Sequence, residues 1–97
     1  MEIKATGASE ITILGNIQSI EDYQEIKDAV RALTDKGHNS ITLRIPDSLS
    51  MPSSVIGFLL KLVHVDNVGV SMLVGDDRLY NLLDILNLIT IFKVKRV

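Results

Sequence analysis

The spacing of hydrophobic residues changes along the chain, and each change marks a predicted element. Residues 2–5 and 10–14 are short segments rich in β-branched side chains and bounded by glycines, so they predict two strands with a turn between them. Ser19 and Asp22 have the spacing of a capping box, and Gly37 suits the end of a helix. Between these signals the apolar residues recur every three or four positions and predict one face of a helix: Ile20, Tyr23, Ile26, Val30 and Leu33.

A strand, a serine-rich loop and an apolar helix are predicted in the middle of the chain. Residues 41–45 alternate apolar and polar side chains, which is typical of a strand with one buried face, and Pro46 ends it. Four serines follow in the loop. Residues 55–65 are apolar around most of the circumference of a helix, so this helix is either buried or presents a face to a partner.

The remaining segments complete an α/β pattern. Residues 68–74 form a β-rich run, a helix with a stripe of leucines begins at Asp76 or Asp77, and residues 89–97 predict a last strand. The predicted order is β-β-α-β-α-β-α-β, which indicates a mixed β-sheet with the later strands parallel and helices packed on it. A chain of 97 residues holds one such domain, which we expect to span residues 1–97.

Composition and charge narrow the classes of function. The net charge of −2 lacks the basic footprint of nucleic-acid binding, so we expect no nucleic-acid partner. The absence of cysteine excludes disulfides, thiolate zinc sites and a cysteine nucleophile. No apolar run approaches the roughly 20 residues of a membrane helix, and no secretory signal is visible at the start. We therefore expect a cytoplasmic protein without direct membrane insertion.

The sequence does not indicate a catalytic or metal-binding constellation. The glycines do not have the spacing of a phosphate-binding or dinucleotide-binding loop, so no cofactor is expected. His38 lies in a predicted turn and His64 at a predicted helix end, and no second histidine is spaced to complete a metal site. Asp76 and Asp77 are explained as the N-cap and a first-turn acid of a helix. We expect no catalytic residues and no enzyme activity; a small enzyme with a site invisible in the sequence remains the alternative.

The serine pair Ser53 and Ser54 is the chemical feature of most interest. Both follow Pro52, and proline suits the first position of a helix, so both hydroxyls are expected in the first helical turn. A phosphate added there brings about −1.5 to −2 charge next to free backbone amides and the positive end of the helix dipole. The helix can hold such a group with little distortion, whereas an acidic or apolar partner meets a very different surface. An ordinary capping and loop role explains the same serines.

The segment DSLSMPSSVIGFL, residues 47–59, resembles the central segment of STAS domains, the family named for sulfate transporters and anti-sigma-factor antagonists. There the loop reads hydrophobic-Asp-Ser-Ser/Thr-Gly-Leu-Gly and precedes an apolar helix. Ser53 matches the serine that the partner kinase phosphorylates in antagonists, and Gly57 keeps the second glycine. Pro52 stands where the family has aspartate, and Val55 replaces the first glycine. The order of predicted elements agrees with the family over nearly the whole chain.

The resemblance implies a STAS-like fold and a regulatory, non-enzymatic protein-binding module. Such an antagonist binds a serine-kinase anti-sigma factor and so acts in signalling and transcription regulation, and phosphorylation of the serine breaks the complex. The implied phosphorylation site is Ser53, with Ser54 as second choice. The implied partner-binding residues are Met51, Pro52, Ser54, Val55, Ile56 and Gly57.

The departures at Pro52 and Val55 keep a second interpretation open. In this alternative the chain is a STAS scaffold or accessory subunit that docks on a transporter or sensor complex without being phosphorylated. Either way, the expected partner is another regulatory protein rather than a nucleic acid or a cofactor.

Overall fold

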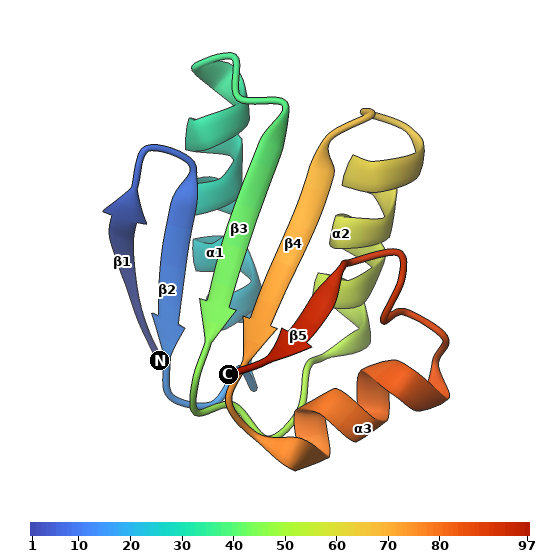
Figure 1. Cartoon of the computed structure of the whole chain (residues 1–97). Coiled ribbons are helices and arrows are strands. Elements are labelled where there is room, and N and C mark those ends of the chain that lie inside the picture. Colours follow the sequence, from blue (N-terminus) through green and yellow to red (C-terminus); the bar gives the residue numbers. More distant parts are fainter.

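The computed structural model describes residues 1–97, and it contains five strands and three helices. Their order is the one predicted from the sequence, so the α/β class is confirmed (Figure 1). The elements are β1 (Glu2–Gly7), β2 (Glu10–Leu14), α1 (Ile20–Asp35), β3 (Ser40–Ile45), α2 (Ser53–His64), β4 (Gly69–Val74), α3 (Asp77–Ile85) and β5 (Val94–Arg96).

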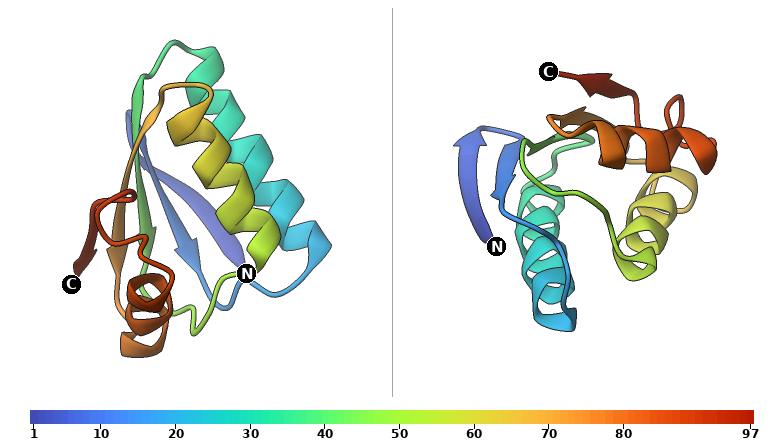
Figure 2. Two further views of the ribbon diagram at one scale, coloured as in Figure 1. Left: turned by 90° about the vertical axis from the view of Figure 1, so that its right-hand side faces the viewer. Right: turned by 90° about the horizontal axis from the view of Figure 1, so that it is seen from below.

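The strands form one mixed sheet in sequence order, β1-β2-β3-β4-β5. The hairpin of β1 and β2 is antiparallel, and every later neighbour is parallel. Both α1 and α2 cover the same face of the sheet, while α3 lies beyond the end toward which β3 and β4 run (Figures 1 and 2). The opposite face carries no helix, which explains why only alternate strand residues are buried.

The core lies mainly between the sheet and the helices α1 and α2, extends to Leu79 and Leu83 of α3, and is almost wholly aliphatic. The strands β3 and β4 turn alternate residues toward the helices, because successive side chains of a strand point to opposite faces. The buried residues of these strands are Ile41, Leu43, Ile45, Val70, Met72 and Val74. The helices oppose them with Ile26, Val30, Leu33, Val55, Phe58, Leu59 and Leu62.

The start and end of α1 follow the predicted signals closely. The Ser19 side chain accepts a hydrogen bond from the backbone N–H of Asp22, and the Asp22 carboxylate accepts one from the N–H of Ser19 in return. This capping box satisfies amides that have no partner within the helix. At the other end Gly37 has a φ of +93°, a left-handed conformation that glycine adopts without steric cost. The capping prediction is confirmed.

Two details differ from the predictions. Pro52 is the N-cap of α2 with an extended backbone, φ −60° and ψ 149°, so the helix begins one residue later, at Ser53. The last strand comprises only Val94–Arg96, so the predicted strand over residues 89–97 is wrong in its first part. Hydrogen bonds from the N–H of Phe92 to Leu88 O (3.0 Å) and of Val94 to Ile89 O (2.9 Å) fold that segment into turns instead.

No helix of the chain combines the length and the apolar character needed to cross a membrane.

Candidate functional site

Three loops meet at the carboxyl ends of β2, β3 and β4 (Figure 1). They comprise residues 15–19, 46–52 and 75–76, and they lead into α1, α2 and α3 respectively. In open α/β sheets the carboxyl ends of the parallel strands are the usual place for binding, because the loops there are free to vary while the strands hold them in position. The serine pair lies at this edge, at the start of α2.

The hydroxyl of Ser48 holds two of these loops together. Ser48 is fully buried, and its Oγ accepts a hydrogen bond from the N–H of Ile17 (3.1 Å) and donates one to the carbonyl oxygen of Ser50 (2.6 Å). Ile17 is itself buried, so its amide depends on this hydroxyl in place of water. Ser48 therefore fixes both the path of its own loop and the attachment of that loop to the segment before α1.

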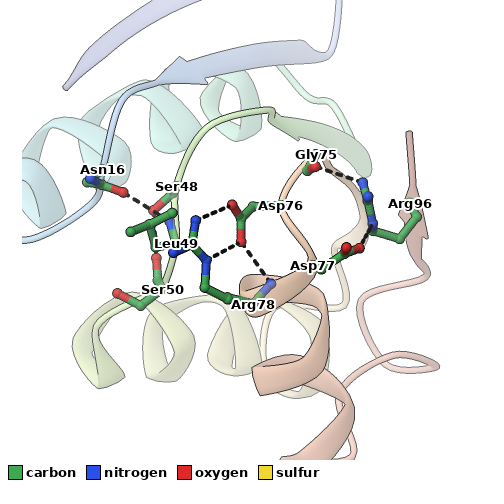
Figure 3. A network of polar contacts seen from close by, with 9 residues as sticks. All are labelled: Asn16, Ser48, Leu49, Ser50, Gly75, Asp76, Asp77, Arg78 and Arg96. Carbon is green, nitrogen blue, oxygen red and sulfur yellow. Dashed lines mark hydrogen bonds and ion pairs between the residues drawn. The ribbon is translucent and has the colours of Figure 1, made fainter.

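Two further hydrogen bonds reinforce the same junction. The side-chain oxygen of Asn16 accepts from the N–H of Leu49 (2.9 Å), as Figure 3 shows, and the Asp47 carboxylate accepts from the N–H of Gly15 (3.2 Å). All three contacts join a side chain to a backbone amide across 31 to 33 residues of sequence. The loop that carries the serine pair is thus anchored on the loop before α1 rather than standing free.

The third loop lies against the second through Gly75. A side-chain carbon at this position would meet the carbonyl oxygen of Pro46 and approach its Cα to 2.9 Å. Glycine is required here because backbone packs directly on backbone. The contact brings the beginning of α3 close to the end of β3.

Ion pairs occupy the acidic groups at the start of α3 (Figure 3). The Arg78 guanidinium donates to both carboxylate oxygens of Asp76, with Nε 3.1 Å and Nη2 3.0 Å away. These bonds, with the N–H of Arg78, hold the pKa of Asp76 below its usual range. Asp77 pairs with Arg96 at 2.7 Å, and the same guanidinium donates to the carbonyl oxygen of Gly75 (2.8 Å). Asp76 is the N-cap of α3 as predicted.

The serine pair itself is accessible. Ser53 and Ser54 are exposed in the first turn of α2, and neither hydroxyl takes part in the hydrogen bonds that anchor the loop. Pro52 makes no side-chain cap, and the first turn contains no acidic residue. By contrast, α1 and α3 each begin with a capping side chain and at least one first-turn acid. The positive end of the α2 dipole is therefore not offset by a negative charge of its own first turn.

The predicted partner-binding residues divide into a buried and an exposed group. Met51 is 5% and Val55 1% exposed, so both side chains belong to the core and hold the loop from beneath. The surface around Ser53 is formed instead by the other predicted residues: Pro52 and Ile56, which are half-buried, and Ser54 and Gly57, which are exposed. We call these residues together with Ser53 the serine surface.

Sequence reasoning identified the serine surface but missed the residues that position it. Ser48 and Asn16 were visible only as loop residues, and Arg96 only as part of a strand, because their partners are remote in sequence. The one available signal for Ser48 was a serine in the loop just after a predicted strand, where such side chains often bind backbone groups. His38 lies in the connection between α1 and β3, and His64 is the last residue of α2, as expected from the sequence.

No group of three or more acidic or imidazole side chains converges in a way that could hold a metal ion, and no pocket is found in the surface. Comparison with protein-family models, with curated proteins and with solved structures found no significant match.

Proposed function

We propose that this protein is a STAS-type regulatory module of the cytoplasm, which binds a serine-kinase anti-sigma factor and is switched by phosphorylation of Ser53. The observation that carries the proposal is the exposed serine pair in the first turn of α2, a helix start with no capping side chain and no acid. The resemblance of residues 47–59 to the STAS loop supports the choice of Ser53 over Ser54.

A phosphate on Ser53 is compatible with the fold. Its charge of about −1.5 to −2 would lie next to the amides at the start of α2 and at the positive end of the helix dipole. The neighbouring loop is held by buried side chains and by Ser48, so the modification leaves the scaffold intact. The effect of the phosphate is therefore on the partner, through repulsion of acidic groups and the cost of burying a charge.

The serine surface suits a partner that is reached by contact rather than by enclosure. It combines the half-buried apolar side chains of Pro52 and Ile56 with Gly57, where an added side-chain carbon would have no neighbour within 4 Å. A partner backbone can approach closely over Gly57, while the hydroxyls of Ser53 and Ser54 stay available to a kinase. The buried residues Met51 and Val55 then act as supports of this surface and not as direct contacts.

The test is incubation of the protein with a purified serine-kinase anti-sigma factor of the same organism and ATP, followed by intact mass spectrometry. We expect the addition of one phosphate to the wild type and none to Ser53→Ala, while Ser54→Ala, a matched exposed neighbour, is still modified. Ser53→Ala should bind the partner as the wild type does. Ser53→Asp should weaken binding at least roughly tenfold, because it places a negative charge in the contact.

The pattern of outcomes separates the proposal from its alternative. Modification that persists in Ser53→Ala and disappears in Ser54→Ala would move the site by one residue. A wild type that binds its partner but takes up no phosphate would overturn the switch, and would favour a scaffold or accessory subunit that docks on a transporter or sensor complex. The family's aspartate and glycine are replaced by Pro52 and Val55, and Val55 is buried in the core, so this alternative has a specific basis.

A further inference from the structure

The strand β1 leaves one edge of the sheet open, on the side away from the serine surface. It pairs only with β2, and its other edge is not covered by a helix (Figures 1 and 2). The backbone groups along such an edge can pair with another strand. Natural edges are commonly protected by a charged residue, and here Lys4 lies in the middle of β1.

The charges on β1 complement themselves in one antiparallel register. Lys4 and Glu2 point to the face without helices, since alternate residues share a face. Within one copy their charged groups are 3.8 Å apart, and both side chains are more than half exposed, at 57% and 63%. If two copies of β1 pair about a two-fold axis at Ile3, each Glu2 lies directly opposite the Lys4 of the other copy. Opposite charges in directly opposed positions stabilise a strand pair.

Both neighbouring symmetric registers are unfavourable. An axis at Glu2 would set the two glutamates directly opposite each other. An axis at Lys4 would set the two lysines directly opposite each other, which is destabilising. It would also require Thr6 and Gly7 to pair with Glu2 and Met1 of the other copy. The hairpin, however, has a register irregularity between Ala5 and Gly7. Such a bulge twists the strand and ends regular pairing. The regular part of β1 is therefore the part that the axis at Ile3 uses.

The helix-side face of β1 fits the same register. Met1, which directly precedes β1, and Ile3 are half-buried apolar side chains that pack at the margin of the core, and Ala5 is exposed. With the axis at Ile3, the two isoleucines meet and each Met1 lies opposite Ala5 of the other copy. Apolar residues thus face apolar residues on one side of the new strand pair, and opposite charges meet on the other.

We propose that a second copy of this chain binds along β1, antiparallel and about a two-fold axis at Ile3, so that the two sheets become one. An isologous contact of this kind closes after two copies and leaves no open edge at the junction. The contact comprises only one strand from each copy, so we expect a weak dimer. Its dissociation constant should lie roughly between micromolar and millimolar. Both serine surfaces stay free in the dimer, because they lie away from the shared edge.

The test exchanges charges at the two positions and follows association by sedimentation velocity over that concentration range. Glu2→Lys sets lysine against lysine, and Lys4→Glu sets glutamate against glutamate, so each variant alone should dimerise roughly tenfold more weakly than the wild type. A mixture of the two variants should form the mixed dimer in preference to either homodimer. The double variant Glu2→Lys with Lys4→Glu should recover the wild-type affinity.

Lys95→Glu is the matched control, because it makes the same charge change on β5 at the opposite edge and is exposed. It should leave the association unchanged. The proposal is overturned if the wild type stays monomeric up to millimolar concentration, if Lys95→Glu weakens the dimer as much as Lys4→Glu, or if mixing the two charge variants does not restore association.

Discussion

Replacing the hydroxyl of Ser48 should lower the stability of the protein measurably. In Ser48→Ala the buried N–H of Ile17 loses its acceptor, at present 3.1 Å away, and the carbonyl oxygen of Ser50 loses its donor. The carbonyl belongs to an exposed residue and can turn to water, but the amide of a residue that is 1% exposed cannot. An orphaned buried donor costs about 1–3 kcal/mol, so we expect a loss of about 2 kcal/mol in the free energy of unfolding.

For a domain of this size, that loss corresponds to a fall in Tm of about 8–16 °C, at roughly 4–8 °C for each kcal/mol. Urea denaturation followed by far-UV circular dichroism measures the free energy, and amide hydrogen exchange should show the largest acceleration at Ile17. Ser50→Ala is the matched control: its side chain is exposed and its carbonyl is retained, so its effect should stay within about 0.5 kcal/mol. Equal effects of the two substitutions, or a Ser48→Ala variant as stable as the wild type, would refute the role assigned to this hydroxyl.

Two further predictions concern glycine and pH. Gly75→Ala should destabilise the fold by about 1–3 kcal/mol or more, because the new methyl group meets the backbone of Pro46. Gly57→Ala, whose new methyl group has no neighbour within 4 Å, should stabilise the helix by up to about 1 kcal/mol. Thermal denaturation that ranks the two variants the other way would contradict this. Hydrogen bonds from the backbone N–H groups of Gln18 and Ser19 lower the pKa of Asp22, so its contribution to stability is present above the unfolded-state pKa of about 4 and is lost as the pH falls through the lower folded-state pKa. Asp22→Asn should therefore be less stable than the wild type at neutral pH and equally stable in strong acid, and urea denaturation across this pH range that shows a constant difference would contradict the assignment.

Much of the fold was predictable because its signals are local. The start of α1 is set by Ser19 and Asp22, three residues apart. Helical spacing also indicates its buried residues Ile26, Val30 and Leu33, but Ile20 of the same predicted face is 77% exposed in the first turn. The strand β3 was predicted from alternation, and β4 from a β-rich run bounded by turn residues. The last strand misled because Phe92 and Val94 alternate with lysines and are both buried, as a strand would require. Phe92 is buried from a turn instead, and only Val94 of this pair belongs to a strand.

The position of the candidate site was predictable from the sequence, but the residues that support it were not. That Ser53 and Ser54 lie exposed at the start of a helix follows from the neighbouring residues. Burial of Met51 does not, because it depends on how the loop folds back onto the core. The contact of Ser48 with Ile17 is equally remote, since nothing near either residue indicates the other. Local sequence thus places the serine pair at a helix start, whereas tertiary packing selects which neighbours reach the surface.

The cross-connection between Ser48 and Ile17 also bears on how the serine pair would be presented to a kinase. A short synthetic peptide of residues 47–59 contains the serines but lacks Ile17. In the folded chain the N–H of Ile17, 31 residues before Ser48, donates a hydrogen bond to the Ser48 hydroxyl. It also lacks the sheet that buries Met51 and Val55. Such a peptide would be a flexible chain, so an enzyme that recognises the folded helix start would discriminate strongly against it. Substrate identity would then be carried by the whole domain, and searches for short phosphorylation motifs would pass this segment by.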